Sequence, residues 1–72
     1  MMYLIKVSGG EYCHKINRGN YYCSEMREFC YLDREKAKRY SKRLSEMGVK
    51  HELIITTASA HETIVPYHLR KE

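Results

Sequence analysis

A stretch with helix signals at both ends most constrains how this chain can fold. Residues 33–48 read DREKAKRYSKRLSEMG. Asp33 is a favourable N-cap because its carboxylate can accept hydrogen bonds from free backbone N–H groups, and Gly48 suits the position just after a helix. Apolar side chains recur through the stretch at helical spacing: Ala37, Tyr40, Leu44 and Met47. The pattern predicts an amphipathic helix over residues 34–47 that buries this apolar stripe.

Short alternating segments predict strands before the helix. Residues 3–8, 11–16 and 21–26 are separated by Gly9-Gly10 and by the turn-forming residues 17–20, whose types tolerate positive φ. A three-stranded meander follows. In its second strand, simple alternation places Tyr12, His14 and Ile16 on one face.

One clear strand follows the helix. Residues 49–57 alternate, and Ile54 beside Ile55 indicates burial on both faces, as in an interior strand. Residues 58–61 read as a turn. A short strand at residues 63–67 would lie at an edge or outside the sheet, because Pro66 has no N–H. Residues 68–72 read as a frayed C-terminal end.

These elements predict an α+β fold: a mainly antiparallel β-β-β-α-β sheet, with room for one further short strand, and a single helix packed on one face. The 72 residues suit one domain, 1–72, with a small core. Of the large residues that lead into the helix, we expect at least two in the core: Phe29, Tyr31 and Leu32.

The charge balance favours an acidic partner. Thirteen Lys/Arg against nine Asp/Glu give a net charge of +4, which suits nucleic acid, an anionic protein patch or a membrane surface. Lys6 interrupts the short N-terminal apolar run, and no segment is long enough to span a bilayer. We therefore expect a cytoplasmic protein with no membrane partner. Three cysteines do not suggest a disulfide framework, which favours reduced thiols.

The candidate binding residues come from the helix and from the hairpin. The basic residues of the helix form either a solvated outer face, supported by a Glu35–Arg39 pair, or a ridge that binds anions. Tyr21 and Tyr22 are adjacent, so within a strand they face opposite sides and one of them should be exposed. As macromolecule-binding residues we predict Arg34, Lys38, Arg39, Lys42, Arg43, Tyr21, Tyr22 and Arg18.

Neither a metal site nor an active site is indicated. The Cys and His residues lack the close-spaced pairs typical of zinc sites, although Cys13 and Cys23 could lie near each other in an antiparallel pair. We expect buried thiols, surface imidazoles, no metal and no cofactor. There is no Gly-rich phosphate loop, paired-carboxylate motif or nucleophile elbow, so we expect no catalytic residues and no enzyme activity.

The order of motifs carries a resemblance. A YLIKV strand, a Gly turn, a Tyr-rich hairpin, the helix DREKAKRYSKRLSEMG and the strand VKHELI follow one another. Over residues 3–56 this order resembles small proteins encoded by phages and prophages of Gram-positive bacteria. The resemblance implies an accessory, host-modifying role in which the protein binds a host protein or nucleic acid. It transfers no functional residue.

Together these observations predict a non-catalytic binding module, encoded by a phage or prophage, that docks on a host macromolecule and inhibits or modulates it. A host protein is the first candidate for the partner. The alternative is a nucleic-acid-binding protein that uses the basic helix and the hairpin tyrosines. A homodimer is a further prediction, because a small sheet with an open edge invites pairing with a second copy.

Overall fold

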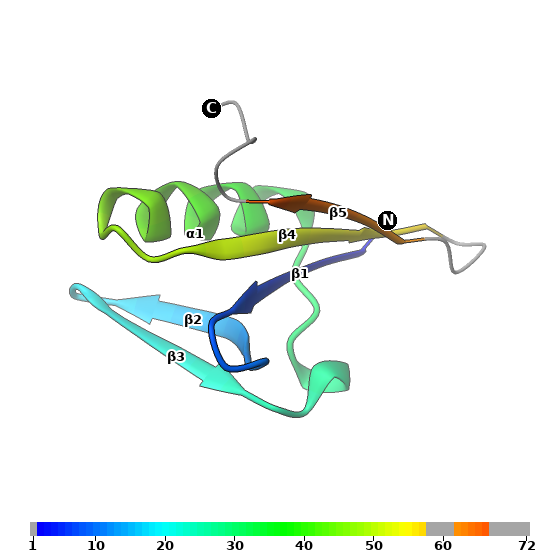
Figure 1. The fold of residues 1–72 in the computed structure, drawn as a ribbon, viewed down its shortest axis with the longest axis horizontal. Helices are drawn as coiled ribbons and strands as arrows, with labels where there is room; N and C mark the ends of the chain where they lie inside the picture. Colours follow the sequence, from blue (N-terminus) through cyan, green and yellow to red (C-terminus); the bar gives the residue numbers. More distant parts are fainter. Residues whose placement is uncertain (1, 58–61, 67–72) are drawn as a thin grey trace.

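A single helix lies on one face of an antiparallel sheet (Figure 1). The computed structural model describes residues 2–57 and 62–66. Within them the five strands are ordered β3-β2-β1-β4-β5. The elements are β1 (Met2–Val7), β2 (Tyr12–Asn17), β3 (Asn20–Ser24), a 3-10 helix η1 (Arg27–Phe29), α1 (Arg34–Glu46), β4 (His51–Thr56) and β5 (Glu62–Pro66). The predicted α+β class is confirmed. The turn and the frayed end predicted for residues 58–61 and 68–72 lie outside the described residues.

The turns of the predicted meander form where the sequence supplies residues that accept positive φ. Gly9 and Gly10 have φ values of 94° and 84°. Between β2 and β3, Asn17 pairs with Asn20 and leaves a two-residue turn, in which Arg18 has φ 50° and Gly19 has φ 80°. Two central residues with positive φ match the right-handed twist of a hairpin.

A β-bulge corrects the predicted faces of β2. Cys13 pairs with Cys23, but the next pair joins Lys15 to Tyr22, so His14 is an extra residue in β2. The extra residue reverses the alternation. Tyr12 therefore packs on one face of the sheet and Ile16 on the other, whereas strict alternation placed them together.

The second half of the sheet follows the prediction. β4 pairs with β1 on one side and with β5 on the other, so it is an interior strand. Ile54 is buried on the face away from α1, and His51 is buried on the face toward it. β5 is an edge strand, as expected from Pro66.

The core that positions α1 lies between the helix and the sheet. Leu44 and Ala37 are buried there, and Tyr40 packs at its margin. Met47 is half-buried. Three residues of the apolar stripe thus pack in this core as predicted: Ala37, Tyr40 and Leu44. Strand and connector residues complete this cluster: Ile5, Val7, Cys13 and Leu32.

A second, smaller core lies on the opposite face of the sheet. The connector between β3 and α1 crosses this face and buries Cys30 against Leu4 and Ile54. The connector then pairs with β1, because the backbone N–H groups of Tyr3 and Leu32 donate to each other's carbonyls at 3.0 and 2.8 Å. Of the large residues expected in the core, Leu32 is buried and Tyr31 packs against the second core, but the side chain of Phe29 is 73% exposed.

Candidate binding surface

The solvent side of α1 carries a dense group of positive charges. Asp33 caps the helix, because its carboxylate accepts a hydrogen bond of 2.7 Å from the backbone N–H of Lys36. Ala37, Ser41 and Leu44 are buried on the inner side, which leaves the other positions facing outward. All six basic side chains of the helix are exposed: Arg34, Lys36, Lys38, Arg39, Lys42 and Arg43.

A buried hydrogen bond shows which side of α1 faces which strand. The hydroxyl oxygen of Ser41 lies 2.8 Å from Nε2 of His51 in β4, so the Ser41 side of the helix faces β4. The helix packs on β1 and β4, and β2 is the next strand beyond β1. The side of α1 opposite Ser41 therefore faces the β2–β3 hairpin.

The basic residues consequently fall on two flanks. At about 100° per residue, Lys36 and Arg43 lie next to Tyr40 on the side away from Ser41. We call this pair the hairpin-side flank. The residues on the Ser41 side form the β4-side flank: Arg34, Lys38 and Lys42. Arg39 points away from the sheet, between the two flanks.

These cations have no acidic partner in the described part of the chain. Over residues 2–57 and 62–66, the ion pair found is between Arg27 and Glu62, and it lies outside α1. The expected Glu35–Arg39 pair does not come within ion-pair distance. The positive charge of the helix is thus available to an external anion.

Tyr21 and Tyr22 lie on opposite faces of β3, as predicted. Tyr21 pairs with Ile16 on the face toward the helix, and Tyr22 pairs with Lys15 on the other face. Their side chains are 39% and 43% exposed, so both are accessible, whereas one was expected. The Lys15 ammonium lies 5.8 Å from the centre of the Tyr22 ring, within range of a cation–π contact.

The structure divides the predicted binding set between two faces. Tyr21 and the hairpin-side flank lie on the same side of the sheet, the side that α1 covers. Arg18 is exposed at the tip of the β2–β3 hairpin, which also carries Tyr21. We define the hairpin-side surface as Arg18, Tyr21, Lys36 and Arg43. Tyr22 and the β4-side flank lie elsewhere. Because α1 packs on β1 and β4, the β2–β3 hairpin extends away from the helix (Figure 1).

The Ser41–His51 pair is the polar site that sequence reasoning missed. Ser41 is 2% exposed and His51 is 3% exposed, so the expectation that the imidazoles lie at the surface is wrong for His51. The second ring nitrogen, Nδ1, lies 2.9 Å from the carbonyl of Val49. A hydroxyl, an imidazole and an orienting acceptor are aligned as in a nucleophile–base pair, but here helix and sheet enclose them. One sequence signal could have predicted the burial of His51: in the alternating pattern of β4 it shares a face with Leu53 and Ile55.

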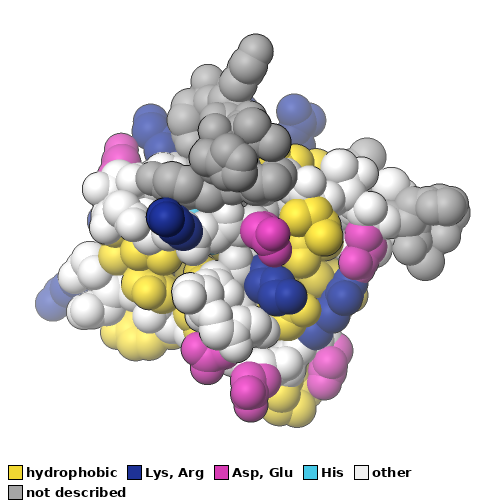
Figure 2. All heavy atoms as spheres, viewed as in Figure 1, with side chains coloured by type: hydrophobic (Ala, Val, Ile, Leu, Met, Phe, Trp, Pro, Cys, Tyr) yellow, Lys and Arg dark blue, Asp and Glu magenta, His cyan; other side chains and the backbone are white. Residues whose placement is uncertain are grey.

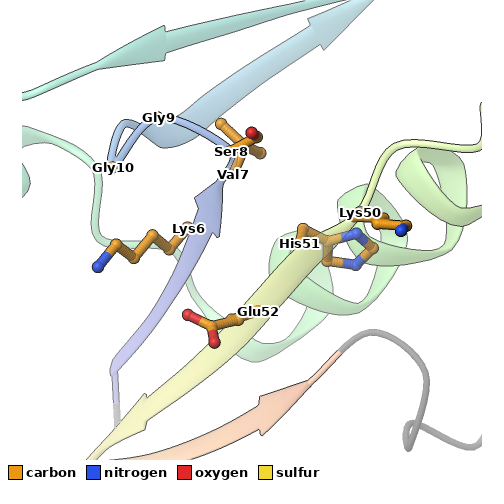
Figure 3. A pocket seen from close by; sticks show the side chains of 8 residues that line it. All are labelled: Lys6, Val7, Ser8, Gly9, Gly10, Lys50, His51 and Glu52. Carbon is orange, nitrogen blue, oxygen red and sulfur yellow. The ribbon is translucent and has the colours of Figure 1, made fainter.

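A shallow hollow lies where β1, the β1–β2 turn and β4 meet (Figure 3). Its volume is about 350 Å³, and Lys6, Gly10, Lys50 and Glu52 contribute to its lining. Lys6 and Glu52 are cross-strand partners. Ser8 and His51 also line the hollow, but the His51 ring is buried and its Nε2 lies against the Ser41 hydroxyl. The hollow therefore does not itself indicate a reaction.

The thiols form no metal site in the part of the chain that the structure describes, where no three potential ligands converge. Cys13 and Cys30 are buried, and all three cysteines are free. Burial is the main cause that raises the pKa of Cys13 to about 11, and the nearby Cys23 thiol adds to the shift. Burial likewise raises the pKa of Cys23 and of Cys30. All three are therefore thiols at neutral pH.

Exposed apolar side chains occur outside the hairpin-side surface. The largest exposed fractions belong to Phe29, Ile64, Met26 and Met2. On the face shown in Figure 2, hydrophobic side chains form separate patches divided by charged side chains. No continuous apolar docking area is visible there.

Comparison with known proteins adds no assignment: no family model, curated protein or solved structure matches this chain. Among the described residues, no helix has the length and apolar character needed to cross a bilayer.

Proposed function

We propose that this chain is a non-catalytic binding module whose hairpin-side surface docks on an acidic patch of another protein. The observation that carries the proposal is that Tyr21 lies on the sheet face that α1 covers, on the side of the helix that carries Lys36 and Arg43. These two cations have no acidic partner among the described residues. Tyr combines apolar contact area with a polar tip and is enriched at interfaces, and Arg shares this enrichment. The phage resemblance adds that the partner is a host protein, which docking inhibits or modulates.

Two features favour a protein over a nucleic acid. A protein that tracks phosphates gathers its cations on one stripe, whereas here they occupy two flanks of α1. Stacking on successive bases needs aromatic rings on one surface, whereas Tyr21 and Tyr22 face opposite sides of β3. Binding to an acidic patch of a protein requires only that a few cations and one aromatic ring match that patch locally.

The test uses charge reversals on the two flanks as matched variants. The hairpin-side variant is Lys36→Glu/Arg43→Glu, and the β4-side control is Lys38→Glu/Lys42→Glu. Both change the net charge of the same helix by the same amount, and all four side chains are exposed. Tagged chains are used as bait in nuclease-treated bacterial lysate, and retained proteins are identified by mass spectrometry.

We expect the wild type and the β4-side control to retain the same protein. The hairpin-side variant and Tyr21→Ala should lose it, with a drop in affinity of at least about tenfold, which corresponds to 1.4 kcal/mol. Equal retention by both charge-reversal variants would contradict the assigned surface. Absence of any specifically retained protein would contradict the proposal itself.

A labelled single-stranded oligonucleotide tests the alternative. If the chain binds it with an affinity that falls steeply as salt rises, and the hairpin-side variant loses this binding, the nucleic-acid function replaces the one proposed here. The homodimer remains a prediction and is measured by sedimentation of the free chain.

A further inference from the structure

Cys13 and Cys23 face each other across the β2–β3 hairpin. They are direct partners in the antiparallel register, and both side chains pack on the same face of the sheet, in the core beneath α1. Residues directly opposite in an antiparallel pair have Cα atoms about 4.5–5.5 Å apart. A disulfide requires a Cα separation of about 4.4–6.8 Å, so the two cysteines can be bridged without moving the strands apart.

We propose that Cys13 and Cys23 form a redox-sensitive dithiol, which a peroxide converts to a cross-strand disulfide. This inference goes beyond the proposed function and does not depend on the partner. Cys30 is not part of the site, because its thiol lies on the opposite face of the sheet, 3.3 Å from the carbonyl oxygen of Met26. The bulge at His14 interrupts the ladder next to the pair, which gives the backbone local freedom to adapt to the new bond.

Burial sets the order of the chemical steps. Cys23 is half-buried and Cys13 is fully buried, so peroxide reaches Cys23 first. The Cys23 thiol loses its proton, the thiolate attacks one peroxide oxygen and the O–O bond breaks. The products are a sulfenic acid on Cys23 and a hydroxide that takes up the proton to become water.

The second step closes the bridge. The sulfur of Cys13 attacks the sulfur of Cys23, the S–O bond breaks, and the departing hydroxide takes the Cys13 proton to form a second water. The two thiols lose two electrons in total and hydrogen peroxide is reduced to two waters. Because burial raises the pKa of both thiols, we expect oxidation slower than that of free cysteine at neutral pH, with a rate that increases as pH rises.

Tryptic mapping tests the pairing directly, since cleavage after Lys and Arg places each cysteine on a separate peptide: residues 7–15, 19–27 and 28–34. After treatment of the folded chain with hydrogen peroxide and blocking of the remaining thiols, we expect peptide 7–15 disulfide-linked to peptide 19–27. Peptide 28–34 should carry the blocking group. The count of free thiols in denaturant should fall from three to one.

Three variants keep the proposal open to refutation. Cys30→Ala is the control and should form the bridge as the wild type does. Cys13→Ala should trap the sulfenic acid on Cys23, which a dimedone probe labels, and Cys23→Ala should not be labelled at Cys13. The wild-type peptide map decides the case where Cys13→Ala does not fold. A map dominated by links to Cys30, or by disulfides between chains, would overturn the proposal, and so would complete retention of three free thiols.

Discussion

The buried Ser41–His51 hydrogen bond should contribute measurably to stability, and Ser41→Ala tests this. The variant removes one hydroxyl at a site where both partners are almost completely buried and the Oγ–Nε2 distance is 2.8 Å. If Nδ1–H donates to the Val49 carbonyl at 2.9 Å, Nε2 is an acceptor and the Ser41 hydroxyl is its donor. Loss of a partner in a buried hydrogen bond costs about 1–3 kcal/mol.

A loss of this size is a large fraction of the free energy of unfolding of so short a chain. At about 0.05–0.15 kcal/mol per residue, a chain of 72 residues has a free energy of unfolding of only several kcal/mol. With a urea m-value of about 1 kcal/mol/M, typical of the smallest domains, the midpoint of urea unfolding should fall by about 1–3 M. Far-UV circular dichroism follows the transition.

Two companion variants make the measurement specific. Ser8→Ala is the control, because Ser8 is exposed next to the β1–β2 turn and its loss should leave the midpoint unchanged. In Ser41→Ala/His51→Leu both polar partners are replaced, so the combined loss should be smaller than the sum of the single losses. A Ser41→Ala midpoint that coincides with that of the wild type would refute the reasoning.

Two further outcomes follow from the cap and from the buried thiols. Asp33→Ala should lower the free energy of unfolding in urea by about 1 kcal/mol, whereas Asp33→Asn, which keeps an acceptor for the Lys36 N–H, should lower it less; equal losses would show that the cap hydrogen bond contributes nothing. Under reducing conditions the free energy of unfolding should also fall at high pH. Because the folded-state pKa of Cys13 is raised to about 11, the stabilisation is fully present below the ordinary cysteine pKa and is lost as pH rises through the folded value. The loss should reach about 2–3 kcal/mol, and Cys13→Ala should flatten this part of the pH profile in urea titrations at several pH values.

Local signals made the helix and the turns predictable. Asp33 and Gly48 act on the backbone within a few residues, so the sequence alone places the start and the end of α1 to within one residue. The same holds for Gly9-Gly10 and for the turn around Gly19, where positive φ values are needed and the residue types permit them. The interior position of β4 followed from its run of apolar residues.

Features that depend on distant segments escaped prediction. Ser41 is a polar residue whose burial is explained by His51, ten positions further along the chain. The extra residue in β2 has no local marker, because the bulge arises from how β2 and β3 pair. Phe29 is large and apolar yet exposed, because Cys30 and not Phe29 enters the second core. The two flanks of α1 could not be separated until the rotation of the helix on the sheet was known.

That rotation links the buried pair to the proposed binding surface. A turn of α1 by one residue, about 100°, would move Lys36 and Arg43 off the side of the helix that faces the hairpin. Two kinds of contact fix this rotation. Ala37 and Leu44 pack into the core beneath the helix. The Ser41–His51 hydrogen bond adds a directional constraint, because a hydrogen bond weakens steeply when its angle is poor. If the bond sets the rotation, Ser41→Ala should reduce the difference in partner retention between the two charge-reversal variants, even under conditions where the chain is fully folded. If the difference persists undiminished, the apolar stripe alone determines which cations lie on the side of the helix that faces the hairpin.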